Sequence, residues 1–211
     1  MIRWFKPVIF LACLGPLAHL GWKAYTSALG ANPIEVITHS TGDWILRFLL
    51  ITLSITPLRK LTGQLWLIRY RRMFGLFAFF YGVLHFLTYI WLDKFFAFHE
   101  MLADVAKRRF ITVGFTGFVL LIPLAITSTT GWIRRLGGRR WNLLHRLIYV
   151  SAIAGVIHYL WLVKADIRKP LQYAFVLFLL LGYRLLTWLL QTNRTRTASS
   201  IPVRSAEVSE G

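Results

Sequence analysis

The sequence predicts an all-α integral membrane protein, in which six transmembrane helices form one bundle and both termini lie in the cytoplasm. The first observation behind this prediction is that 56% of the 211 residues are hydrophobic and gather in long runs, which a soluble domain of this size does not contain. The second is that basic residues flank these runs. Because the net charge of +17 is spread in this way and forms no single patch, we do not expect nucleic-acid binding.

Six apolar segments account for residues 1–190, which we expect to form one transmembrane domain. The first begins like a secretory signal, but Pro16 interrupts it and five further segments follow, so we expect a retained helix. The second is short and contains Arg47. Residues 191–211 are polar and rich in Ser and Thr, and we expect a disordered cytoplasmic tail. By hydropathy, the predicted spans are Pro7–Tyr25, Trp44–Leu58, Phe74–Leu92, Phe110–Ile126, Leu144–Leu162 and Leu171–Leu190.

The basic residues also predict the orientation in the membrane. They are concentrated at the N-terminus, in the second and fourth loops and in the tail, whereas most acidic residues lie in the other loops. Cytoplasmic loops carry an excess of Lys and Arg, so both termini are expected in the cytoplasm. Lys107, Arg108 and Arg109 run against this bias.

Two histidines, His145 and His158, belong to the predicted fifth span. An ionisable group inside a membrane span is costly unless it is satisfied, so each is a candidate for a functional site. A separation of 13 residues corresponds to about 20 Å along a helix, which places one imidazole near each side of the membrane. Imidazole is a common axial ligand of haem iron, so this spacing suggests two haems at two depths.

The third span supplies a partner for one of these histidines. Arg71, Gly75, Ala78, Gly82 and His85 share one face of a helix. The small residues on this face allow close approach either of a flat macrocycle or of another helix, and the pattern alone does not decide between the two. His85 lies about as far from the start of the third span as His158 lies from the start of the fifth. The two are therefore expected to meet toward the periplasm as the axial ligands of a haem b.

At the cytoplasmic side, His145 has no histidine partner. The residue at the matching depth of the third span is Arg71, whose guanidinium stays protonated and is a poor iron ligand. We expect it either to pair with a haem propionate or, like its neighbour Arg72, to anchor the helix at the cytoplasmic membrane surface. His19 is expected to be a packed histidine, more readily than a ligand.

Several kinds of site are not predicted. Cys13 is the only cysteine, so no disulfide within the chain is possible. His39 and His99 fall in expected outer loops and should be solvated. The chain contains no GxGxxG or Walker sequence, so we expect no nucleotide-binding domain of its own.

These residues resemble the ferric-reductase-like transmembrane family, which includes the membrane portions of NADPH oxidases. That resemblance implies two b haems between the third and fifth helices, held by histidines 13 or 14 residues apart. His145 and His158 match this spacing. The corresponding pair in the third helix would be Arg71 and His85, so this sequence has Arg where a fourth histidine is expected.

A closer resemblance is to the bacterial MsrQ family. It implies a multi-pass protein of the inner membrane that binds one or two haems b, with an FMN also attributed to the family. It further implies electron transfer from the quinone pool or a cytosolic flavin reductase to a periplasmic molybdopterin methionine sulfoxide reductase, which is the catalytic subunit. The resemblance rests on LGANPIEVITHSTGDW, ITPLRK, LIRYRRMFGLFAFFYGVLHFLTY, LAITSTTGWIRRLGGRRWNLLHRLIYV and IHYLWLVK.

Two other functions fit the sequence less well. A membrane transporter would favour broken helices, internal repeats and carboxylates inside the spans, and no acidic residue is predicted inside a span. A stand-alone ferric or oxygen reductase would need an attached dehydrogenase domain. Histidines at matched depths favour the electron conduit over both.

Overall fold

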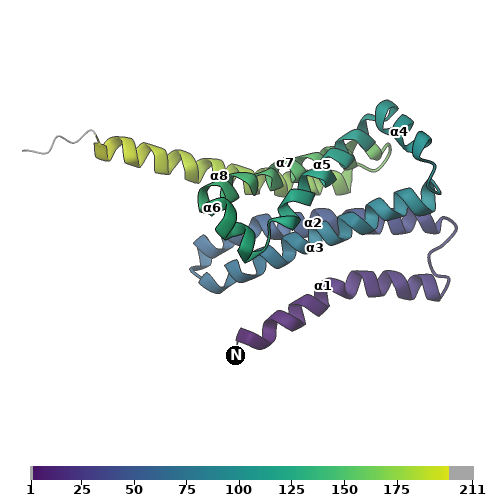
Figure 1. Ribbon diagram of the computed structural model, residues 1–211, viewed down its shortest axis with the longest axis horizontal. Coiled ribbons are helices and arrows are strands. Elements are labelled where there is room, and N and C mark those ends of the chain that lie inside the picture. The colour runs from purple at the N-terminus through teal and green to yellow at the C-terminus, as the bar shows by residue number, and fades with distance from the viewer. Residues whose placement is uncertain (1, 200–211) are drawn as a thin grey trace, which may run out of the picture.

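The computed structural model describes the backbone of residues 2–199 and the side chains of residues 5–192. Within these limits every regular element is helical (Figure 1). Two of them are short: η1 is a 3₁₀ turn, and η2 is a π-helix that continues α3. The elements are α1 (Ile2–Tyr25), α2 (Pro33–Thr62), η1 (Leu65–Leu67), α3 (Ile68–Leu87), η2 (Thr88–Asp93), α4 (Phe98–Lys107), α5 (Arg109–Ile126), α6 (Thr130–Leu144), α7 (Leu147–Leu162) and α8 (Arg168–Ser199).

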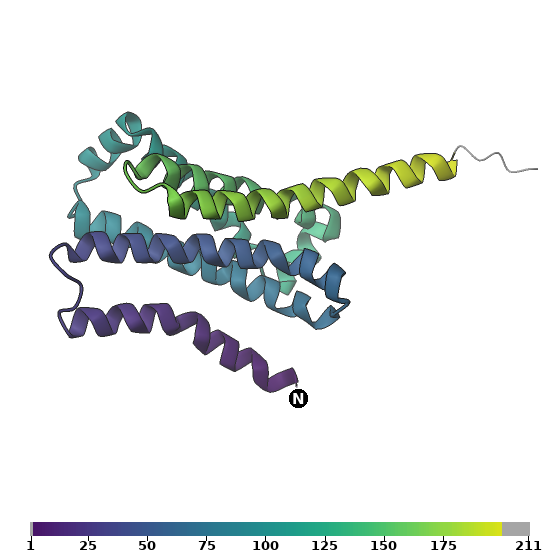
Figure 2. The ribbon, with the colours of Figure 1, turned by 180° about the vertical axis from the view of Figure 1, so that it is seen from behind.

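Two tightly packed helix pairs form the centre of the bundle. Helix α2 packs along α3, and α5 packs along α7. Contacts of α3 with α5 and of α2 with α7 join the two pairs, and α8 covers α2 and α7. Helix α1 makes fewer contacts, with α2 and α3, and diverges from them toward its start (Figures 1 and 2).

The chain is a multi-pass membrane protein. Among the described residues, five helical stretches are long and apolar enough to cross a membrane: Phe5–Tyr25, Leu65–Asp93, Arg109–Ile126, Thr130–Leu162 and Arg168–Thr192. Helix α2 is not one of the five, because charged residues such as Asp43 and Arg47 reduce its hydropathy. It nevertheless contributes many of the most deeply buried core residues, among them Leu49 and Leu53.

Helix α2 is much longer than the predicted span Trp44–Leu58. Its start is fixed by Asn32, whose Oδ1 accepts a hydrogen bond from the Glu35 N–H at 3.4 Å, and by Pro33 in the first turn. Ser, Thr, Asp or Asn before such a turn is a typical helix start. Hydropathy alone missed this start, because the first turns of α2 are polar.

The fourth loop of the prediction is also helical. It forms α6, in which Gly137 has a left-handed φ of 73° and divides the element into two short helices. The predicted fifth span began at Leu144, but α7 begins at Leu147 after a turn. His145 lies in that turn, outside α7. The rotation that an ideal helix would give between residues 145 and 158 therefore does not apply to it.

The sixth span is longer than predicted. Helix α8 continues past Leu190 to Ser199, so the first part of the expected tail is helical. The remainder of that tail, residues 200–211, lies outside the described residues.

A tyrosine holds α1 to the bundle at a bend in the helix. In a regular helix the Leu17 N–H would donate to the Cys13 carbonyl. Here the Leu17 N–H donates to the Tyr81 hydroxyl at 3.2 Å, and that hydroxyl donates to the Cys13 carbonyl at 2.9 Å. Insertion of a side chain next to Pro16 is a known cause of a helix bend, and α1 bends in both views (Figures 1 and 2).

The two ends of the bundle differ in charge. The start of α1, the turn between α2 and α3, α6 and the end of α8 lie at one end, here called the terminal end (Figure 1). The opposite end, here called the α4 end, carries α4 and the loops that join α1 to α2 and α7 to α8. All acidic residues with described side chains belong to the half of the bundle nearer the α4 end: Glu35, Asp43, Asp93, Glu100, Asp104 and Asp166.

Candidate functional site

Two histidines meet near the α4 end of the bundle. His85 comes from the last turn of α3 and His158 from the last turns of α7. Their ring centres are 6.3 Å apart, and the ring planes are nearly perpendicular, at 86°. Because α3 and α7 belong to different helix pairs, the two imidazoles lie where these pairs join.

Each of these rings is oriented by a backbone carbonyl. The Nδ1 of His85 lies 3.0 Å from the Thr38 carbonyl oxygen, and the Nδ1 of His158 lies 2.7 Å from that of Phe110. A carbonyl oxygen can only accept, so each Nδ1 carries the hydrogen and each Nε2 of the neutral ring keeps its lone pair. This arrangement is typical of histidines that bind a metal through Nε2.

Two glycines allow the helices to approach these rings. A Cβ atom at Gly114 of α5 would lie 2.5 Å from the Nδ1 of His158, closer than real Cβ contacts come. A Cβ atom at Gly42 of α2 would lie 3.3 Å from the Cε1 of His85. Glycine is the residue that permits such close backbone approach. Both imidazoles are therefore held against a helix backbone.

The spacing of the rings leaves room for one metal ion between them. With metal–nitrogen bonds of about 2.0 Å and about 1.2 Å from each nitrogen to its ring centre, two axial imidazoles have ring centres about 6.4 Å apart. The observed separation of 6.3 Å agrees with this value. The ring separation and the two Nε2 lone pairs are therefore compatible with a group that takes two nitrogen ligands. The described side chains contain no cluster of three or more His, Cys, Asp or Glu residues suited to a metal ion held by the protein alone.

Aromatic side chains fill the space between α3 and α5 beside this pair. Phe118 stacks on Phe79 with ring centres 5.9 Å apart, and Phe86 lies 5.0 Å from Phe118. A Cβ atom at Gly82 would lie 3.1 Å from Phe118. The glycines of the α3 face thus serve helix packing, as does Gly75, which faces Thr52 of α2.

His145 has a different environment near the terminal end. Its Nε2 lies 3.0 Å from the hydroxyl oxygen of Thr127, and its ring stacks on Trp141 with centres 3.9 Å apart. The Thr127 hydroxyl donates to the Pro123 carbonyl at 2.6 Å, so it accepts from His145. The hydrogen of His145 is therefore on Nε2 and the lone pair on Nδ1, the opposite of the other two histidines.

Arg71 lies in the first turn of α3, at the same end of the bundle as His145. It is half-buried and close enough to His145 to interact with it electrostatically. Arg72 is exposed and donates to the Ser128 carbonyl at 3.2 Å. The two neighbouring arginines therefore face different surroundings, as expected if only the first shares the His85 face of α3.

The remaining histidines lie apart from these sites. His19 is exposed on α1, so the expected packed histidine is not found there. His39 lies on α2 and not in a loop, although its side chain is exposed as predicted. His99 is exposed in the first turn of α4.

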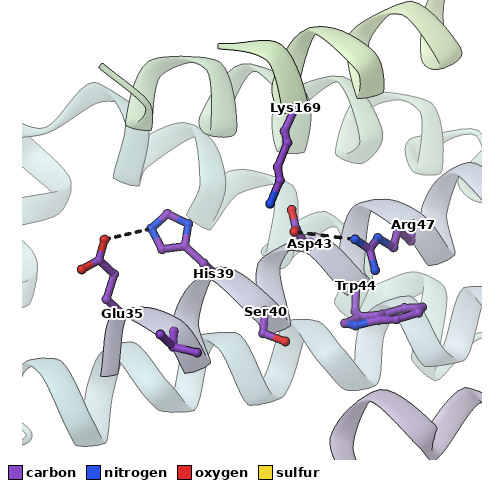
Figure 3. A pocket seen from close by; sticks show the side chains of 8 residues that line it. Glu35, His39, Ser40, Asp43, Trp44, Arg47 and Lys169 are labelled. Carbon is purple, nitrogen blue, oxygen red and sulfur yellow. Dashed lines mark ion pairs between the residues drawn. The ribbon is translucent and has the colours of Figure 1, made fainter. Parts of the chain in front are cut away.

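A polar cavity of about 350 Å³ lies between α2 and α8 near the α4 end. Its charged side chains follow one face of α2: Glu35 pairs with His39 at 3.7 Å, and Asp43 pairs with Arg47 at 3.8 Å. Lys169 of α8 points toward Asp43 across the cavity (Figure 3). The residues of α2 that contact His85 lie on the opposite face of the helix, so one helix separates this cavity from the histidine pair.

The cavity contains an acidic residue well inside a long helix, which the sequence did not predict. The side chain of Asp43 is only 15% exposed, and Arg47 beside it donates to the Tyr173 hydroxyl at 3.1 Å. These contacts satisfy the charges within the bundle.

Comparison with known proteins shows the family to which this chain belongs. Residues 40–156 match the family described as ferric reductase like transmembrane component. A protein of Herminiimonas arsenicoxydans, named protein-methionine-sulfoxide reductase heme-binding subunit MsrQ, is 56% identical over 181 residues, which are 85% of this chain and 83% of that protein. Relatives of the same name from Xanthomonas campestris pv. campestris strain 8004 and Azospira oryzae are 51% and 50% identical, covering 93% and 95% of this chain and 92% and 84% of their own lengths. The chain belongs to the MsrQ family.

Membership of the MsrQ family confirms the resemblance found in the sequence. Sequence reasoning did not identify the residues that position the two histidines. Thr38 and Phe110 act through backbone carbonyls, which any residue possesses, so no pattern of side chains marks them. Gly114 was detectable as a glycine inside an apolar helix, but its partner becomes visible only when α5 and α7 are packed together.

Proposed function

We propose that this chain is a membrane haem-binding electron-transfer subunit and that His85 and His158 are the axial ligands of one haem b. The observation that carries this proposal is the approach of the two rings to 6.3 Å with both Nδ1 atoms hydrogen-bonded to carbonyls. The relatives at 50–56% identity are named as heme-binding subunits, which supports the same function here.

The chain's own residues would prepare the site before the group binds. The carbonyls of Thr38 and Phe110 fix the tautomers and leave Nε2 of each ring available. Gly42 and Gly114 permit the rings to lie against helix backbones, and the phenylalanines between α3 and α5 exclude water. A bound haem would supply a carrier that takes up and releases one electron at a time.

We further propose a second cofactor position at the terminal end, next to His145 and Arg71. It is less prepared than the first, because the Nε2–H of His145 donates to Thr127.

The proposed orientation places the terminal end in the cytoplasm of a bacterial cell, with six crossings of the inner membrane once α2 is counted. The Lys and Arg residues that flank the turn between α2 and α3 and those of α6, all at the terminal end, support this orientation through the positive-inside rule. The first haem would then lie toward the periplasm. Arginines of α6, namely Arg134, Arg135, Arg139 and Arg140, would face an anionic electron donor.

The proposed path runs from the quinone pool or a cytosolic flavin reductase, through this chain, to a periplasmic methionine sulfoxide reductase that contains molybdopterin. The names of the relatives support a partner that reduces methionine sulfoxide in proteins. This chain would move electrons, and the partner would carry out the catalysis. Glu35, Glu100 and Asp166 lie at the α4 end, where the partner would dock.

The path can be tested in membrane vesicles that receive reductant only on the cytoplasmic side. Adding the purified periplasmic reductase together with methionine sulfoxide should re-oxidise the haem, whereas either addition alone should not. A haem that stays reduced in the presence of both would refute the proposed acceptor.

A further inference from the structure

Arg184 is a charged residue inside an apolar helix. It lies in the membrane-spanning stretch Arg168–Thr192 of α8 and is half-buried. Its Nη1 donates to the Tyr149 hydroxyl at 2.6 Å, and its Nη2 donates to the Leu53 carbonyl at 2.8 Å. An arginine in such a position is costly and commonly has a function, so its partners need to be accounted for.

The Nη2 of Arg184 supplies a hydrogen-bond donor that helix α2 lacks. The carbonyl of Leu53 would normally accept from the N–H of residue 57, but residue 57 is proline and has no N–H. Arg184 supplies the missing donor. This structural role accounts for Nη2, and the Tyr149 hydroxyl accounts for Nη1.

The Nε of Arg184 remains without a partner. Among the described side chains, only two buried polar atoms lack a hydrogen bond, and these are the Nε of Arg184 and the Oγ1 of Thr56. Thr56 lies three residues after Leu53 on α2, which places both on the same side of that helix. The two unsatisfied groups therefore belong to one region, and both can donate a hydrogen bond.

Arg71 completes this region. Gly42 faces His85 and Gly75 faces Thr52, which fixes the antiparallel register of α2 and α3. One turn further toward the terminal end, the same register places Arg71 opposite Thr56. Arg71 is also close enough to Arg184 and His145 to interact with both electrostatically.

No acidic side chain compensates these charges within the described part of the chain. Neither Arg71 nor Arg184 has a carboxylate within ion-pair distance among the described side chains, whose ion pairs lie nearer the α4 end. Uncompensated positive charge in an apolar setting is destabilising, and an anion removes that penalty.

We propose that Arg71, Arg184 and Thr56 bind one carboxylate or phosphate group of a ligand that lies beside His145. Guanidinium groups bind both kinds of oxyanion through paired hydrogen bonds. Two sources share this chemistry: a propionate of a haem beside His145, or the phosphate of a flavin mononucleotide. The inference rests on the proposed function for the identity of the ligand, but the anion site itself does not.

The test uses the full-length protein with Arg71→Gln, Arg184→Gln and Thr56→Val. Arg72→Gln is the matched control, because Arg72 is adjacent to Arg71 but exposed. Potentiometric titration of the haem is the first measurement. Loss of a positive charge destabilises the reduced state of the haem, which is the more negative one. If the anion is a propionate, both arginine variants should therefore have a lower midpoint potential, and the midpoint potential of the control should not change.

Flavin mononucleotide binding, followed by flavin fluorescence, is the second measurement. A phosphate source predicts that each arginine variant weakens binding about tenfold or more, as expected for a charge-assisted hydrogen bond, while the haem potential is unchanged. Thr56→Val should weaken the binding of the same ligand, although it changes no charge. If neither measurement distinguishes the arginine variants from Arg72→Gln, the anion site is refuted.

Arg184→Lys distinguishes the effect of the positive charge from that of the hydrogen bond to the Leu53 carbonyl, because lysine keeps the charge but lacks the paired donors of the guanidinium. Equal loss of folding in Arg184→Lys and Arg184→Gln, with no change of potential or flavin binding in Arg71→Gln, would show a structural role and overturn the proposal. Glu207→Gln with Glu210→Gln tests the acidic residues of the tail. If that double variant reproduces the effects of Arg184→Gln, the anion belongs to the chain itself and the proposal is also overturned.

A wild-type protein that purifies without haem would refute the proposed function. The flavin measurement would still decide the anion site in that case, so the two failures are distinguishable.

Discussion

The imidazoles of His85 and His158 lie with their ring centres 6.3 Å apart and their planes at 86°, and each ring donates from Nδ1 to the backbone of a neighbouring helix. Four helices therefore define this one contact: α3 and α7 carry the rings, and α2 and α5 orient them. Because these helices form two packed pairs, the geometry of the site depends on how the pairs are joined.

Because α5 approaches His158 closely, adding one methyl group at Gly114 should displace the imidazole. Gly114→Ala would place a Cβ atom 2.5 Å from the Nδ1 of His158, so the ring must move and lose its bond to Phe110. Overpacking of this kind costs about 1–3 kcal/mol. We expect lower haem content and a lower melting temperature in purified protein. Gly15→Ala, which has nothing within 4 Å of its added Cβ, is the control.

Equal haem content in Gly114→Ala and Gly15→Ala would show that the backbone of α5 does not position His158. The midpoint potential provides an independent measurement, because a displaced ligand changes the potential even where the haem is retained.

The Tyr81 hydroxyl should hold α1 to the bundle without affecting the histidine pair. Tyr81→Phe removes the group that joins the Leu17 N–H to the Cys13 carbonyl, at a cost of about 1 kcal/mol or more for two buried partners. We expect faster amide hydrogen exchange in the middle of α1, measured by mass spectrometry, with an unchanged haem spectrum. Tyr25→Phe, at an exposed tyrosine, should change neither. Unaltered exchange of α1 in Tyr81→Phe would contradict this role.

Helix α4 is held by a small ion-pair network with a predictable dependence on pH. The Lys94 ammonium lies 2.7 Å from Asp104 and, by donating a hydrogen bond, lowers the pKa of that carboxyl, while the same contact raises the pKa of Lys94. Because the folded-state pKa of Asp104 is lowered, its stabilising contribution is present above the ordinary range near pH 4 and is lost as the pH falls below it.

Two measurements check this expectation. Asp104→Asn should increase amide exchange of residues 98–107 at neutral pH, because the charge of the pair is removed. The wild-type protein should show the same increase only below about pH 4, after correction for intrinsic exchange rates. Glu100→Gln is the comparison, since its contact with Lys94 is longer, at 3.9 Å, and its side chain is exposed. Equal exchange in the Asn and Gln variants would argue against the network.

The position of His145 predicts a second, separable effect. His145→Ala should perturb a haem distinct from the one between α3 and α7, or else slow the entry of electrons from the cytoplasmic side. Thr127→Val should produce a milder change of the same kind, because it releases the Nε2–H of His145 without removing the ring. A spectrum and reduction rate identical to wild type in His145→Ala would remove this residue from the electron path.

The sequence predicted the parts of the fold that depend on apolar length and missed those that depend on local capping. The apolar spans near α1, α3, α5, α7 and α8 were found, because hydropathy reports burial in lipid. The first turns of α2 and nearly all of α6 are polar, so hydropathy predicts loops there. Asn32 before Pro33 is the local capping signal that marks the start of α2.

The histidine pair was predictable because depth in a membrane follows from counting residues along parallel helices. The tautomers were not, because backbone carbonyls leave no trace in a sequence. The role of Arg184 depends on Pro57, a residue far away in the chain, and the contact between Arg184 and the carbonyl left without a donor exists only once α2 and α8 are packed together.

The ligand role of the central pair is tested most directly by haem content and the reduced-minus-oxidised optical spectrum of purified His85→Ala and His158→Ala, with His39→Ala as the control on the exposed face of α2. We expect wild-type protein and the control to bind haem with a low-spin b-type spectrum. Each of the two central variants should insert into the membrane but lose that low-spin component. Unchanged haem content and spectra in both variants would contradict the account.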